Sequence, residues 1–71
     1  MKFILTEHVR LRMSLRGITE KMIEEALSKP DRTALGYSNR LLAYKKFDKG
    51  TIKVVYTIEE DTPVIITVIW D

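Results

Sequence analysis

The sequence has 71 residues, 45% of them hydrophobic, a formal net charge of +2, one histidine and no cysteine. This length corresponds to one domain, residues 1–71, close to the lower limit for a chain that folds without disulfides or a structural metal. The missing cysteines exclude disulfides and thiolate–metal sites, and the small net charge does not by itself predict nucleic-acid binding. The core must be small, which leaves room for a homodimer or a partner protein.

The chain has no apolar run long enough to cross a membrane. The longest run, from Val64 to Trp70, is short and is interrupted by Thr67. The N-terminal residues also lack the long apolar stretch of a signal peptide. We therefore expect a cytoplasmic protein without a membrane partner.

The first part of the chain predicts two short helices. Thr6 is a typical N-cap for a helix that runs to about Leu15, and Gly17 allows the turn that follows. Thr19 is a second N-cap, and the second helix ends before Pro30, because proline disfavours helical geometry in the residue before it. The apolar stripe of this helix has four residues, Met22, Ile23, Ala26 and Leu27.

After Pro30 the pattern changes from helical to strand-like. A short segment, 33–37, precedes a turn at Ser38-Asn39. Three segments rich in β-branched and aromatic residues follow, Leu41–Phe47, Thr51–Ile58 and Val64–Trp70. The predicted fold class is α+β, with two N-terminal helices packed on a three- to four-stranded antiparallel meander sheet.

The hairpin loop at Asp48-Lys49-Gly50 sets which sheet face meets the helices. With Phe47 opposite Thr51, the more apolar face carries Leu42, Tyr44, Lys46, Ile52, Val54, Tyr56 and Ile58. We expect this face to receive the helices and the other face to be more solvated and partly basic. The last segment is apolar at nearly every position, which predicts a central or otherwise covered strand, but its loop does not decide the face of Thr67.

The histidine begins a stripe at four-residue spacing, His8, Arg12 and Arg16. Residues four apart share one face of a helix, and apolar residues flank this stripe on both sides. We therefore expect His8 and Arg12 to share a site that faces the sheet or its edge. His8 can act as a general acid or base near neutral pH, and the arginines can hold phosphate. The alternative is a histidine hydrogen-bonded to the sheet with arginines in internal ion pairs, and for Arg16, beside the turn, the structural role is favoured.

The head motif His8-x-x-x-Arg12-Met13-x-x-Arg16-Gly17-Ile18 and the helix–helix–meander order resemble a family of short prokaryotic proteins. That family is known only as a domain of unknown function and is grouped with RelE/ParE-like toxins and related small ribonuclease folds. The resemblance covers nearly the whole chain, including Ala26-Leu27-Ser28-Lys29-Pro30 at the end of the second helix. It implies a RelE/ParE-like fold, RNA as a partner, and a cognate antitoxin-like protein as another.

Two hypotheses follow. In the first, the domain binds RNA, weakly and with strong salt dependence, and cleaves it without a metal ion. His8 and Arg12 are then the catalytic residues, and the nucleic-acid contacts are Arg16, Arg40, Tyr44, Lys45 and Lys53. In the second, the domain is a non-catalytic interaction module that binds a partner chain along a sheet edge, and the histidine–arginine stripe is internal scaffolding. Under either hypothesis, their place on the apolar face favours Tyr44 and Tyr56 as core residues over a platform for bases.

No cofactor or metal is predicted by either hypothesis. One histidine, no cysteine and no converging carboxylates give no metal-ligand set, and the sequence has no glycine-rich phosphate loop. Solvent access separates the two hypotheses. An exposed cleft with His8 and Arg12 favours the first, and burial of both beside acidic partners favours the second.

Overall fold

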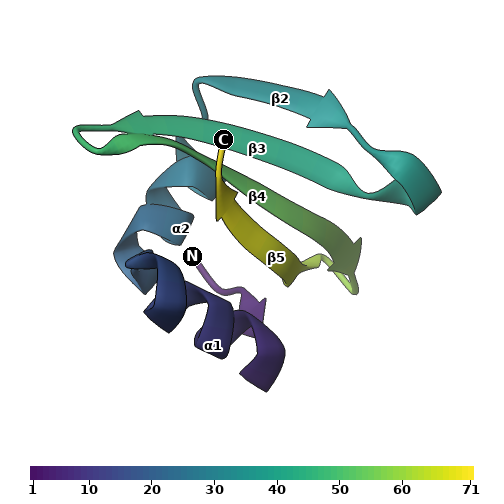
Figure 1. Cartoon of the computed structure of the whole chain (residues 1–71). Helices are drawn as coiled ribbons and strands as arrows, with labels where there is room; N and C mark the ends of the chain where they lie inside the picture. The colour runs from purple at the N-terminus through teal and green to yellow at the C-terminus, as the bar shows by residue number, and fades with distance from the viewer.

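The computed structural model describes all 71 residues and places two helices on one face of a five-stranded sheet (Figure 1). The sheet order is β1-β5-β4-β3-β2, antiparallel except for β1, which runs parallel to β5. In chain order the elements are β1 (Ile4–Leu5), α1 (Glu7–Arg16), α2 (Glu20–Ser28), β2 (Arg32–Leu35), the 3-10 turn η1 (Tyr37–Asn39), β3 (Leu41–Phe47), β4 (Gly50–Glu59) and β5 (Thr62–Trp70).

The predicted α+β class and the two N-terminal helices are confirmed, but the prediction of a purely antiparallel sheet of three to four strands is wrong. Strands β2 to β5 form the predicted meander, and β1 adds a fifth, parallel strand. β1 is only two residues long, Ile4 and Leu5, and pairs with Val64 and Ile65 near the other end of the chain. A two-residue strand shows no alternation of side chains, so the sequence gives no local signal for it.

Both helices begin and end where their capping residues predict. The Thr6 side chain accepts a hydrogen bond from the N–H of Val9, and Thr19 does the same for Met22, each over 3.2 Å. Gly17 ends α1 with a left-handed φ of 67°, which glycine adopts without a Cβ clash. These local contacts fix the short connection that lays α1 and α2 on the same side of the sheet.

The register of the β3–β4 hairpin differs from the predicted one. Phe47 pairs with Gly50 rather than Thr51, so the loop contains only Asp48 and Lys49. A shift of one residue transfers every side chain of a strand to the opposite face. Relative to β4, the predicted faces of β3 are therefore exchanged. The side of β3 that shares a face with Ile52, Val54 and Tyr56 carries Leu41, Ala43, Lys45 and Phe47.

A β-bulge in β5 explains a spacing that strand alternation alone does not allow. Ile65 and Val68 are both fully buried although they lie three residues apart. Val55 pairs with Thr67 and the next residue, Tyr56, pairs with Ile65, so Ile66 is the extra residue of the bulge. Thr67 therefore lies on the face away from the helices. The prediction that β5 is an interior strand is confirmed, since it lies between β1 and β4.

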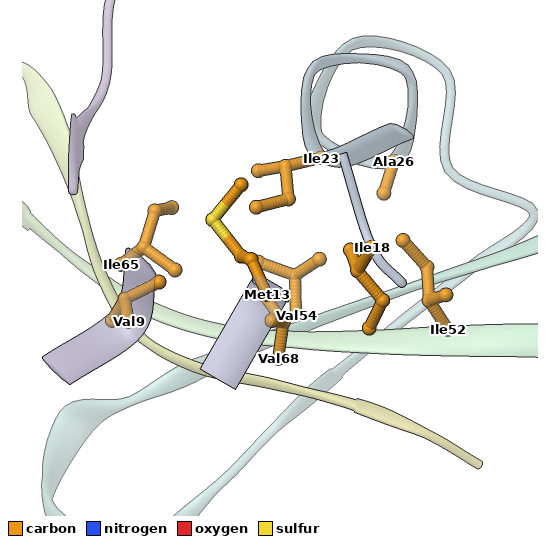
Figure 2. Packing of buried hydrophobic residues seen from close by; sticks show 9 residues of the cluster. All are labelled: Val9, Met13, Ile18, Ile23, Ala26, Ile52, Val54, Ile65 and Val68. Carbon is orange, nitrogen blue, oxygen red and sulfur yellow. The ribbon is translucent and has the colours of Figure 1, made fainter. Parts of the chain in front are cut away.

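The hydrophobic core fills the space between the helices and one sheet face (Figure 2). Helix α1 packs against β5, and α2 packs across β3 and β4. Each fully buried aliphatic side chain contributes about 1.5–3 kcal/mol. The core consists of Val9, Met13, Ile18, Ile23, Ala26, Ile52, Val54, Ile65 and Val68.

The opposite side of the sheet has no covering layer, and we call it the open sheet face. Strand register assigns to it Arg32, Leu42, Tyr44, Lys46, Thr51, Lys53, Val55, Thr67 and Ile69. Neither helix is long and apolar enough to cross a membrane.

Candidate functional site

The stripe on α1 brings the histidine and one arginine into contact. The Nε of Arg12 donates a long hydrogen bond of 3.5 Å to Nε2 of His8. His8 is exposed and Arg12 is half-buried, and neither forms an ion pair. Neither residue lines a pocket. The pair is thus open to solvent without a cleft. It is neither in an exposed cleft, as the first hypothesis requires, nor buried beside acidic partners, as the second requires.

Arg16, the third member of the stripe, links α1 to the last strand. Its Nη1 donates to the carbonyl oxygen of Val68 over 2.7 Å, and the indole Nε1 of Trp70 donates back to the Arg16 carbonyl over 2.7 Å. The two bonds satisfy a backbone acceptor on each partner, one at the helix end and one on β5. These bonds tie the C-terminal end of α1 to β5.

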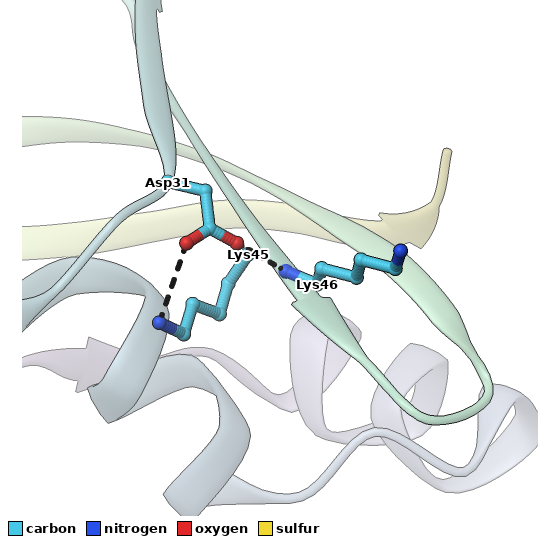
Figure 3. Close-up of polar contacts among 3 residues, drawn as sticks. All are labelled: Asp31, Lys45 and Lys46. Carbon is cyan, nitrogen blue, oxygen red and sulfur yellow. Dashed lines mark hydrogen bonds and ion pairs between the residues drawn. The ribbon is translucent and has the colours of Figure 1, made fainter.

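Lys45 and Lys46 are tied to an acid that precedes β2 (Figure 3). Lys45 Nζ lies 3.5 Å from Oδ1 of Asp31, and the backbone N–H of Lys46 donates to Oδ2 of Asp31 over 2.7 Å. The Lys46 N–H and, more weakly, the Lys45 ammonium lower the pKa of the Asp31 carboxyl below its usual value. Lys45 lies on the helix side of the sheet in this ion pair, whereas the Lys46 side chain extends away from Asp31.

Tyr44 lies on the open sheet face, not on the helix-facing side as the predicted register required. The Arg32 guanidinium carbon lies 3.8 Å from the centre of the Tyr44 ring and covers it, so Tyr44 is only 9% exposed. Lys53 on β4 pairs directly with Tyr44. Arg32 is not among the residues predicted from the sequence. The feature that could have identified it is the β2–β3 hairpin, in which Arg32 pairs with Tyr44.

A shallow groove of about 380 Å³ lies beside this cluster on the open sheet face. Two of the predicted nucleic-acid contacts, Arg40 and Lys53, come together in its lining. The lining residues are Leu35, Gly36, Tyr37, Arg40, Leu42, Lys53 and Val55. β2 and β3 contain no acidic residue. The only acid of β4, Glu59, lies six positions from Lys53, roughly 20 Å along the strand.

The predicted site residues thus fall into separate groups. His8, Arg12 and Arg16 belong to the helix layer, whereas Arg40, Tyr44 and Lys53 lie on the open sheet face. Lys45 belongs to neither group, because it is paired with Asp31 on the helix side. No group of three His, Cys, Asp or Glu side chains is placed to hold a metal ion. What the arrangement offers chemically is an exposed imidazole on one side and a cationic, partly apolar surface on the other.

The chain matches a domain of unknown function, DUF4258, over residues 5–70. It belongs to the DUF4258 family. The match includes both helices and all of β2 to β5. The predicted membership of a family known only as a domain of unknown function is confirmed at this level. No curated protein and no solved structure matches the chain.

Proposed function

We propose that this DUF4258 domain binds RNA through the open sheet face, without a metal ion. The relationship to RelE/ParE-like toxins that the head motif suggests is part of the proposal. One observation carries it: three cations, Arg32, Arg40 and Lys53, gather with an aromatic ring on a sheet face whose neighbouring strands β2 and β3 have no acid. Cations bind the phosphate backbone and release its counterions, which supplies affinity for any sequence.

The shape of the surface favours a single strand over a duplex. A duplex is read by an element that enters a groove, whereas RNA with unpaired bases can lie across an exposed sheet. The groove combines charged walls at Arg40 and Lys53 with apolar side chains, Leu42 and Val55. Such a surface can hold phosphates at its rim and bases over its apolar part.

Cleavage of the bound RNA is a separate question, because the imidazole lies elsewhere. A general acid or base must come within about 3 Å of the proton that it transfers. His8 belongs to α1, which packs on the covered side of the sheet, so RNA on the open face does not reach it. We therefore propose binding as the activity of the open sheet face. The ribonuclease hypothesis, with His8 and Arg12 as catalytic residues, requires a second RNA contact on α1.

The test is fluorescence anisotropy with a labelled single-stranded 12-nucleotide RNA at low salt with EDTA. The logarithm of the binding constant should fall linearly with that of the salt concentration, by about 0.7 per phosphate contact. Lys53→Met should weaken binding and reduce this slope by about 0.7. Lys21→Met is the matched control, because Lys21 is exposed on α2, away from the open sheet face.

Absence of binding at low salt, or equal weakening by Lys21→Met and Lys53→Met, would overturn the proposal. The same samples should contain intact RNA at the end of the titration. Metal-independent cleavage that His8→Ala abolishes would instead support the ribonuclease hypothesis.

The free edge of β2 favours a second candidate function, a module that pairs with a partner chain. β2 is bonded only to β3, and its last residue, Leu35, and Tyr37 just beyond it are 82% and 94% exposed. An extended segment can add a strand to such an edge. The Gly36 N–H donates to the Arg40 carbonyl, so alternation turns the Thr33 N–H outward. If copies of this chain pair here, sedimentation should show a dimer that Thr33→Pro dissociates. A monomer at every concentration would exclude self-pairing.

A further inference from the structure

The Arg32–Tyr44 pair covers one face of a guanidinium group on an exposed side chain. The ring of Tyr44 lies against the inner face at 3.8 Å, a stacking distance. Tyr44 is almost buried, whereas Arg32 is exposed, so the outer face of the guanidinium points to solvent. Arg32 forms no ion pair and its side chain makes no hydrogen bond, which leaves its donors free.

The acid nearest to Arg32 in the sequence does not neutralise it. Asp31 is engaged by the Lys46 N–H and the Lys45 ammonium. Strand register places two more cations near Tyr44 on the open sheet face, Lys53 opposite it and Lys46 two residues along β3. Like charges this close repel each other, and an anion bound among them removes the repulsion. A planar cation with a free face, surrounded by unneutralised charge, suits a ligand that is both flat and anionic.

We propose that Arg32 is a base-stacking residue, on whose outer guanidinium face an unpaired nucleobase of a single-stranded RNA lies. Tyr44 acts as a positioning residue that holds the guanidinium flat from below, and Lys53 contacts the adjacent phosphate. The inference rests on the proposed RNA binding and adds the kind of contact and the requirement for unpaired bases. Bases stack on arginine planes and aromatic rings irrespective of their identity, so little sequence preference is expected.

The alternative is that Arg32 merely covers Tyr44, as long side chains cover apolar surface elsewhere. Lysine separates the two roles, because it keeps the charge and the aliphatic stem but has no planar group to stack. A covering or purely electrostatic role survives Arg32→Lys, whereas base stacking does not. Tyr44→Phe keeps the supporting ring, and Tyr44→Leu removes it.

The experiment compares two strands by fluorescence anisotropy, an eight-nucleotide oligouridine and a ribose-phosphate strand of the same length without bases. Wild type should bind oligouridine about tenfold more tightly than the abasic strand. Arg32→Lys should bring oligouridine close to the abasic value and leave abasic binding and the salt slope unchanged. Tyr44→Leu should act in the same direction, and Tyr44→Phe should resemble wild type. Arg10→Lys, at an exposed arginine on α1 away from the open sheet face, is the matched control and should keep the tenfold preference.

Three results would overturn the stacking role while leaving RNA binding intact. These are an unchanged preference in Arg32→Lys, an equal loss of preference in Arg10→Lys, and binding of duplex RNA as tight as that of the single strand. If wild type binds neither strand at low salt, the proposed function itself fails. Circular dichroism of each variant verifies folding. If Tyr44→Leu unfolds, Arg32→Lys alone still decides the test. Equal binding of oligodeoxythymidine supports stacking and broadens the ligand to single-stranded nucleic acid.

Discussion

Replacement of Arg16 by methionine should destabilise the domain far more than the same replacement at Arg10 on the same helix. Arg16 donates to the Val68 carbonyl over 2.7 Å in a half-buried setting. A hydrogen bond from a charged donor contributes about 1.5–3 kcal/mol, and partial exposure favours the lower end. Methionine keeps an unbranched stem and a similar helix propensity, so the loss reports mainly on the missing bond.

Arg10 is the internal reference. Its Nη1 lies 3.1 Å from Oε1 of Glu20, but the two side chains are 60% and 57% exposed. Exposed pairs of this kind contribute only about 0.2–1 kcal/mol, because water screens them and both side chains lose freedom. Arg10→Met should therefore cost less than about 1 kcal/mol.

Chemical denaturation at 25 °C, followed by circular dichroism, measures both losses, and melting gives a second reading. A loss of 1 kcal/mol lowers Tm by roughly 4–8 °C in a domain of this size, so Arg16→Met should lower it by roughly 6–12 °C. Equal losses of unfolding free energy in the two variants, or an Arg16→Met variant as stable as wild type, would show that the bond from Arg16 to β5 does not stabilise the domain. At a temperature where it is folded, Arg16→Met should bind RNA like wild type, which separates Arg16 from the predicted nucleic-acid contacts.

Two further predictions concern a carboxylate and a turn. Because the Lys46 N–H and Lys45 lower the pKa of Asp31 in the folded state, its contribution to stability is present above the usual carboxyl pKa. That contribution is lost as the pH falls through the lowered pKa. The Tm should therefore fall less steeply between pH 6 and 2 in Asp31→Asn than in wild type. An equally steep fall of Tm in the two proteins would contradict this. Gly17→Ala should cost about 1–2 kcal/mol from its φ of 67° alone, as no atom lies within 4 Å of an added Cβ, and Gly17→Asn should cost less by the same melting assay.

The helices were predictable because their signals are local. Thr6 and Thr19 each accept a hydrogen bond from a backbone N–H three residues ahead, and Gly17 takes a conformation that other residues avoid. The four-residue spacing likewise placed His8 beside Arg12, since helix geometry alone brings such side chains together. What α1 packs against is a tertiary property, and the spacing carries no information about it.

The sheet was predictable in outline and not in register. The strand-like segments are correct within two residues, but the face of each side chain depends on the loop length, which for Asp48-Lys49 is one residue shorter than expected. The bulge at Ile66 has the same consequence in β5, because Ile65 and Val68 both reach the core only if alternation is interrupted between them. Neither feature has a signature in the residue pattern, since both are fixed by packing against the helices and neighbouring strands.

The register also decides what the open sheet face can bind. In the predicted register Tyr44 would be a core residue and Lys53 would share the solvated face with Lys45. In the structure Lys45 shares the helix-facing side with Val54 and Ile52 and is paired with Asp31, whereas Tyr44 and Lys53 lie opposite each other on the open sheet face. The length of the Asp48-Lys49 loop thus places Lys45, which is paired with Asp31, and Lys53, which forms no ion pair, on opposite faces of the sheet. The ring on which Arg32 lies is set separately, by the β2–β3 pairing of Arg32 with Tyr44. The proposed RNA contacts therefore come from cross-strand pairs at the open sheet face, whereas the histidine–arginine stripe belongs to α1 in the opposite layer.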